Sequence, residues 1–360
     1  INNSSKPLEN INISPYNENS GIFVNDNVVR YPTEIFMYVG GVVGQNNGEL
    51  GNISGTANIE VGESTLCMYV GGIAGKNTKQ IVALNQNNSL ITANIKTNTS
   101  NLNSAVGGAV GYMFNNAATD QASILKNYDV VPTIVSTTCV GGIVGLSEAN
   151  ISNCYSFPMF ISGKTNVGGA VGKTTNTSQI QNVFVEISNK EFLSSSLPCI
   201  IYGEENVGGF GGFLLGNIAK CYVSSFIGLS QKPLNTNWQN DEYAGDIVGL
   251  KYVGGFAGLI GDDVEGCTAD VNTCFANVKV AATDSTNNGG FVAKFVSKNE
   301  LIKISCCYAI TDFIIETTKS SSEVKKSGAF AGEVVATGEE KITECYAVLG
   351  TIKTNEGNGA

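Results

Sequence analysis

The segment Val140-Gly141-Gly142-Ile143-Val144-Gly145 is the clearest of seven copies of one phrase, in which Val-Gly-Gly precedes two mostly apolar residues and a small residue. The copies begin at Val39, Val70, Val106, Val140, Val167, Val207 and Val253. Two degenerate copies, which lack the leading Val, follow at residues 288–293 and 327–332. Successive copies begin 31, 36, 34, 27, 40, 46, 35 and 39 residues apart. Such self-similarity indicates one repeat architecture rather than separate globular domains.

The composition of the 360-residue chain is that of a folded, β-rich protein, with 42% hydrophobic residues, 14% charged residues and 43 glycines. Gly, Asn and Ser supply the turns, because the chain has only 7 prolines. β-branched residues, Gly and Asn interrupt every window long enough for an amphipathic helix. The helical solenoids are therefore excluded.

Each unit holds about three short β-rich stretches bounded by Gly, Asn or Ser, as in residues 140–145, 151–155 and 157–161. This pattern predicts an all-β protein, a parallel β-solenoid wound as a right-handed β-helix of about nine irregular rungs. At about 4.8 Å per rung, the rod would be on the order of 40 Å long. The expected parts are a cap or lead-in strand at 1–36, the solenoid at 37–350, and a tail or junction to a missing segment at 351–360.

The paired glycines have a structural and a functional interpretation. They let backbones approach closely or adopt a positive φ at a corner, where a Cβ would clash with neighbouring rungs. A glycine-rich loop can also bind phosphate, but this needs a helix N-terminus or an amide nest and usually a cation. Only Lys76 and Lys173 directly follow a copy, and no helix pattern follows either. The structural interpretation is therefore favoured.

Ten cysteines are present without histidine and without a Cys-x-x-Cys pair, which disfavours a zinc site. Five occupy one place in the repeat, each followed by Tyr or Phe: Cys154, Cys221, Cys274, Cys307 and Cys345. The last four belong to successive units, so we expect a column with about 4.8 Å between layers. Small buried thiols that fill apolar space are favoured over disulfides between layers. Strand alternation puts Cys154 opposite Ile151 and Tyr155, unless a bend at Asn153 resets it.

Charge and hydropathy exclude two classes of partner. The net charge is −10, the only arginine is Arg30, and no lysine cluster exists, so nucleic acid is not an expected partner. No stretch approaches the roughly 20 apolar residues of a membrane-spanning helix. Several Asn-x-Ser/Thr sequons permit secretion without proving it.

One region offers candidate ligand-binding residues. Asp262 and Asp263 lie in the most acidic part of the chain and would be the first ligands of a Ca²⁺ site bracing an insertion. Trp238 and Tyr243 lie in the 223–252 insertion, where exposed aromatic rings would stack on sugars. An ordinary solvated acidic loop is the favoured interpretation. Without histidine, an enzyme here would have to use carboxylates, Lys, Tyr or Cys, and a polysaccharide-cleaving site would use carboxylates such as Asp241 and Asp263.

The pairing of Val-Gly-Gly-hydrophobic-Val-Gly at residues 140–145 with Ile-x-Asn-Cys-Tyr at 151–155 resembles the GLUG-motif repeats. These repeats occur in large secreted and surface-attached proteins, including bacterial adhesins and IgA-cleaving metalloproteases. The resemblance extends over roughly residues 38–350 and implies an extracellular β-solenoid used for display, adhesion or spacing. The units here are longer and more irregular, and the His-Glu-x-x-His zinc motif of the metalloproteases cannot exist in a chain without histidine.

Three functional hypotheses follow. The first is a non-enzymatic structural or adhesive protein of the cell surface or extracellular space, whose uncapped last rung joins a second copy, end to end, or an adjoining domain. Surface glycans or host proteins are its other expected partners. The second is a glycan-binding module that uses the 223–252 insertion. The third is a carboxylate-based polysaccharide hydrolase or lyase.

Overall fold

The computed structural model describes residues 1–3, 6–14, 21–24, 36–84, 89–115, 123–188, 201–226, 246–283, 287–298, 300–317, 326–338 and 341–356. The regular elements in these ranges are all strands, and their pairings are parallel, which confirms the all-β, parallel prediction. Within the same ranges, no helix has the length and apolar character needed to cross a membrane.

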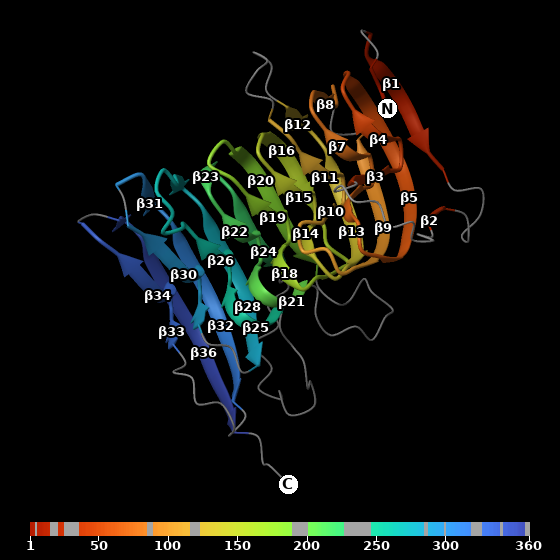
Figure 1. Cartoon of the computed structure of the whole chain (residues 1–360). Coiled ribbons are helices and arrows are strands. Elements are labelled where there is room, and N and C mark those ends of the chain that lie inside the picture. The colour runs from red at the N-terminus through yellow and green to blue at the C-terminus, as the bar shows by residue number, and fades with distance from the viewer. Residues whose placement is uncertain are drawn as a thin grey trace.

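A nine-stranded sheet contains one strand from each copy of the glycine phrase, stacked in chain order (Figure 1). Its strands are β4 (Val43–Asn46), β7 (Ala74–Asn77), β11 (Val110–Met113), β15 (Val144–Ser147), β19 (Val171–Thr174), β22 (Gly211–Leu214), β26 (Ala257–Ile260), β30 (Val292–Ser297) and β34 (Ala331–Ala336).

The other 27 strands form the second sheet. They are β1 (Leu8–Ile13), β2 (Ile22–Val24), β3 (Phe36–Gly40), β5 (Leu50–Ser64), β6 (Cys67–Gly71), β8 (Gln80–Val82), β9 (Leu90–Thr99), β10 (Ala105–Gly107), β12 (Ile124–Lys126), β13 (Asp129–Val135), β14 (Cys139–Gly141), β16 (Asn150–Ser156), β17 (Phe160–Ser162), β18 (Thr165–Gly168), β20 (Gln179–Ser188), β21 (Ile201–Gly208), β23 (Gly216–Ala219), β24 (Tyr222–Phe226), β25 (Ile247–Gly254), β27 (Ala269–Asn272), β28 (Phe275–Thr283), β29 (Asn287–Gly289), β31 (Ile302–Ser305), β32 (Tyr308–Thr317), β33 (Lys326–Gly328), β35 (Ile342–Thr343) and β36 (Tyr346–Glu356).

The copies stack in register, so one layer is the chain from one glycine phrase to the next. The phrase valines are Cα partners along the sheet, as Val70 is with Val106 and Val106 with Val140. The degenerate copies keep this register, because Asn288 pairs with Val253 on one side and with Ser327 on the other. Pairing in β36 continues to Glu356, beyond residue 350.

The paired glycines are required by close approach between layers. A Cβ added to Gly142 would overlap the carbonyl oxygen of Gly169 in the next layer, and a Cβ on Gly141 would overlap the carbonyl oxygen of Val144. The Gly142 N–H donates to the carbonyl of Gly168 at 3.1 Å. Neither glycine has a positive φ, so of the two structural explanations the close approach applies here.

The left-handed conformation is adopted instead by Asn153, whose φ is 52°. Asparagine tolerates this region better than most residues. The bend resets the strand alternation, so Ile151 and Cys154 are both fully buried while Tyr155 faces outward. Asn153 accepts a hydrogen bond from Asn182 (3.1 Å) and donates one to Asn127 (3.3 Å), which joins three layers. The structure thus contains the bend at Asn153 that the sequence left open as an alternative to regular alternation.

The core is a continuous apolar interior running through the layers. Its C-terminal half holds a stack of phenyl rings at the position after the paired glycines. Phe210, Phe256 and Phe291 are fully buried, with ring centroids 4.7 Å apart and planes within 3°. Phe330 in the last layer stacks on Phe291 at 5.0 Å.

Candidate functional site

The structure stacks Cys221, Cys274, Cys307 and Cys345 in successive layers as free thiols. Each thiol donates to the carbonyl two residues before it, at 3.2 Å from Cys221 and Cys274 and 3.1 Å from Cys307 and Cys345. The intervening residue is left-handed in every case: Lys220, Thr273, Cys306 and Glu344, with φ between 52° and 56°. The thiol thus adds a second donor to a carbonyl at the bend. The carbonyls of Asn272, Ser305 and Thr343 also accept a backbone N–H from the layer before, each at 3.1 Å.

The sulfurs also accept hydrogen bonds from the layer before. The backbone N–H of Cys274 lies 3.4 Å from the Cys307 sulfur, and that of Cys307 lies 3.4 Å from the Cys345 sulfur. Tyr128 has the same role elsewhere in this column, because its hydroxyl accepts from the Ile53 N–H at 3.3 Å. The thiols are therefore hydrogen-bonding partners of the bent backbone as well as apolar filler.

Replacing Cys307 separates these two roles. Cys307→Val keeps an apolar side chain but leaves the Cys274 N–H without its partner, which we expect to cost about 1–3 kcal/mol. The Ser305 carbonyl loses the thiol but keeps the Thr273 N–H at 3.1 Å. Cys307→Ser retains a donor and an acceptor, so we expect it to unfold at a higher urea concentration than the valine variant. Urea denaturation of both measures the difference. The opposite order would show that the thiols act only as filler.

Alkaline pH should destabilise the fold through the buried thiols. Burial raises the pKa of the fully buried Cys139 and Cys154 from 9.0 to about 12. A raised pKa means that the contribution to stability is complete below pH 9 and is lost as pH rises to about 12. Cys154→Ala should therefore reduce the fall of the unfolding free energy by about 1.4 kcal/mol per pH unit in this window. Thermal melts between pH 8 and pH 11 test this; equal slopes for both proteins would contradict it.

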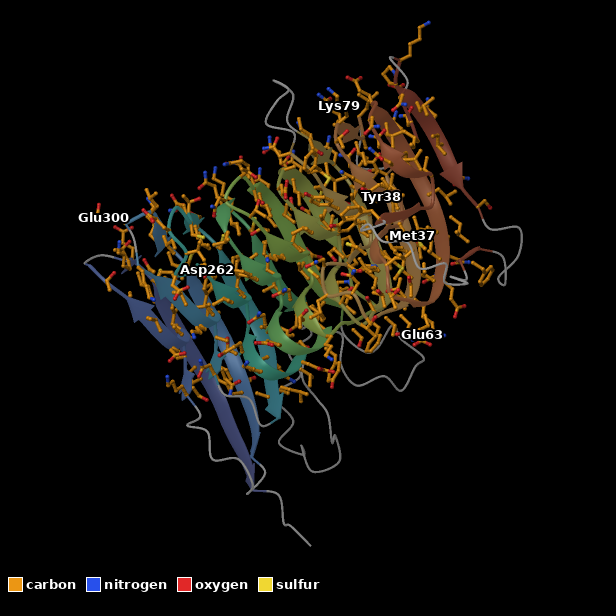
Figure 2. All side chains as sticks on the ribbon, in the orientation of Figure 1. Met37, Tyr38, Glu63, Lys79, Asp262 and Glu300 are labelled. Carbon is orange, nitrogen blue, oxygen red and sulfur yellow. The ribbon has the colours of Figure 1, made fainter. Side chains whose placement is uncertain are left out.

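Of the acidic candidates, Asp262 (Figure 2) is half-buried and Asp263 is exposed. Asp263 forms an ion pair with Lys298 at 2.8 Å, and Asp262 accepts a hydrogen bond from the Asp263 N–H at 2.7 Å. In the part of the chain that the structure describes, no group of three or more acidic, cysteine or histidine side chains is placed to hold a metal ion. The Ca²⁺ hypothesis stays a prediction.

The residues proposed for sugar binding, Trp238 and Tyr243, lie outside the described residues, as do Asp241 and most of the 223–252 insertion. The glycan-binding and polysaccharide-cleaving hypotheses therefore stay predictions. Loss of glycan-array binding on Trp238→Ala would test the first of them.

The two lysines that follow a glycine phrase contact aromatic rings. The Lys76 ammonium lies 4.5 Å from the centre of the Phe114 ring, and 5.5 and 5.6 Å from Tyr38 (Figure 2) and Tyr112. Lys173 lies 5.3 Å from the centre of the Phe213 ring. Burial lowers the pKa of Lys76. Both lysines thus have a packing role, since an ammonium over a ring face is attracted by its quadrupole.

An outer aromatic column, which the sequence pattern indicated only as a Tyr or Phe after five of the ten cysteines, follows the bend on the outside. Its members are Tyr155, Phe184, Tyr222, Phe275, Tyr308 and Tyr346, with neighbouring ring centroids 4.5 to 5.2 Å apart. All are half-buried except Tyr346 in the last layer, which is 60% exposed. Offset stacking at this separation stabilises the layers.

Two carboxylates that the sequence pattern did not single out lie beside this column. Asp129 is the Cα partner of Tyr155 in the next layer, and Glu186 lies two residues after Phe184. The Glu186 carboxylate accepts a hydrogen bond from the Tyr222 hydroxyl at 2.7 Å. Burial, and then the charge of Glu186, raises the pKa of Asp129. A carboxylate next to aromatic rings can hydrogen-bond a polar or cationic ligand whose flat face lies on the rings.

Comparison with known families matches one segment of the repeat. The model of "The GLUG motif" matches residues 136–157, which include the glycine phrase at 140–145 and the bend at Asn153. Neither the curated proteins nor the solved structures show a match to this chain. The resemblance to the GLUG-motif repeats is thereby confirmed for this segment, and the chain carries a GLUG motif at residues 136–157.

Proposed function

We propose that the protein is a non-enzymatic structural or adhesive component of the cell surface or extracellular space, shaped as a right-handed β-solenoid rod of about nine rungs. The observation that carries the proposal is the continuity of the layers, since the nine-stranded sheet runs without reversal from β4 to β34. Columns of phenyl rings, thiols and asparagines add contacts between layers along the same axis. Such a stack resists bending, which suits a protein used for spacing or display.

The two ends of the stack support assembly from end to end. In the described last layer, β34 and β36 are paired on one side only. Apolar side chains remain exposed there, with Val334 at 51%, Tyr346 at 60% and Val348 at 53%. At the other end, among the described strands, β1 is paired only with β5. Parallel strand edges with the same spacing favour addition of another chain, so we propose a second copy as the partner, with an adjoining domain or a surface glycan or host protein as the other partners.

Electron microscopy across a concentration series tests this function. We expect filaments of wild-type protein that lengthen as the concentration rises. Tyr346→Lys should shift them to single rods, because it removes the aromatic face and adds a charge at the junction. The matched control is Leu250→Lys, which adds the same charge at a 39% exposed position in β25 and should leave filaments intact. Single rods of wild-type protein at every concentration would overturn end-to-end assembly.

A further inference from the structure

The Tyr155–Phe157 pair on the outer surface is flanked by two negative side chains. The two rings lie 5.9 Å apart with planes within 5° of each other. Asp129 lies in the layer before Tyr155, whereas Glu186 belongs to the layer after it. The surface formed by Asp129, Tyr155, Phe157 and Glu186 is called the acidic–aromatic patch below.

Neither carboxylate of the patch has a cation as partner within the described ranges. The Asp129 Oδ1 atom is buried and accepts no hydrogen bond. Glu186 accepts from the Tyr222 hydroxyl, which is neutral. Exposed carboxylates elsewhere do have cations, as Glu60 pairs with Lys96 at 3.0 Å and Glu205 with Lys251 at 2.9 Å. The patch therefore has negative charge that no cation of the described residues neutralises.

Two features identify the donor by its chemistry. The half-buried rings of Tyr155 and Phe157 offer an apolar surface on which a planar cation can lie. The carboxylates of Asp129 and Glu186, in the layers before and after the pair, can accept several N–H donors. A guanidinium group meets both needs, since it is flat, always charged and carries five donors. An ammonium group is a compact point charge that does not present this plane.

We propose that the acidic–aromatic patch binds an arginine side chain of a partner protein, with the guanidinium lying on Tyr155 and Phe157 and donating to Asp129 and Glu186. The inference does not depend on end-to-end assembly, because the patch lies in the middle layers rather than at either end. It assigns an interaction surface to the side of the rod.

The test is an NMR titration of the full chain with the blocked tripeptide Gly-Arg-Gly. We expect saturable binding in the millimolar range, with shifts of the Tyr155 and Phe157 ring signals. The same peptide with citrulline in place of arginine keeps the shape and removes the charge, and should not bind. Asp129→Asn and Glu186→Gln should each weaken binding at least tenfold, whereas Glu265→Gln, at an exposed acid outside the patch, should not.

The variants also report on the fold. Because Asp129 and Glu186 raise each other's energy as like charges, we expect Asp129→Asn to melt at or above the wild-type temperature. Weaker binding by a variant that melts normally would therefore be due to the lost contact. Equal binding of the arginine and citrulline peptides, equal binding of a Gly-Lys-Gly peptide, or no binding of the arginine peptide would each overturn the proposal. None of these outcomes bears on filament formation.

Discussion

Gly142→Ala is expected to destabilise the protein by more than about 4 kcal/mol, at the upper end of single substitutions. The added Cβ would overlap the Gly169 carbonyl oxygen, which belongs to the backbone of the next layer and cannot move without opening the Gly142 hydrogen bond to Gly168. The Ser156 Oγ, 2.5 Å from the same Cβ position, adds to the crowding. Urea denaturation followed by far-UV circular dichroism measures the loss.

Gly51→Ala is the matched control for this prediction. A Cβ at Gly51 would come no closer than 3.2 Å to the flexible Glu9 side chain and 3.3 Å to the Val82 carbonyl oxygen. We expect a change within about 1 kcal/mol, because the lower entropy of the unfolded chain offsets part of the crowding. A similar loss for both variants would mean that contact between the layers is not the reason for the paired glycines.

Phe256→Ala is expected to cost about 3–5 kcal/mol. The ring is fully buried between Phe210 and Phe291, each with its centroid 4.7 Å away, so truncation leaves a cavity that neighbours on both sides cannot fill. The unfolding free energy in urea is again the measurement.

Two further variants serve as controls for this prediction. Phe256→Leu retains most of the volume and should cost less than about 1.5 kcal/mol. Phe23→Ala removes a ring that is 65% exposed and should change the unfolding free energy by no more than about 0.5 kcal/mol. A loss of unfolding free energy for Phe256→Ala as small as that for Phe23→Ala would contradict the stacked core.

The stacking register was predictable because its cause is visible in single residues. Where backbones of adjacent layers touch, only glycine fits, so Gly142 and its counterparts mark the same place in every layer. The bend at Asn153 stayed one of two alternatives, although asparagine is one of the few residues that adopt a positive φ at low cost. At Lys220 and Glu344 no such signal exists, and the bend there follows from the register of the neighbouring layers.

The candidate site was less predictable. The recurrence of Tyr or Phe after five of the ten cysteines indicated a column, but not that its rings face outward. Asp129 and Glu186 are separated by a whole layer of sequence and follow no shared pattern. They lie on either side of the Tyr155–Phe157 pair only because intervening loops of different length return the chain to the same register.

The sequence by itself determined the number and order of the glycine phrases, the exclusion of helices and the parallel stacking of the layers. These follow from local sterics, which act on each residue whatever lies elsewhere in the chain. Only the tertiary structure decided how the thiols pair with the bent backbone, and which charged side chains lie beside the aromatic column without a cation. Those contacts join residues about 30 to 60 positions apart, and their geometry depends on how each layer returns to its neighbour.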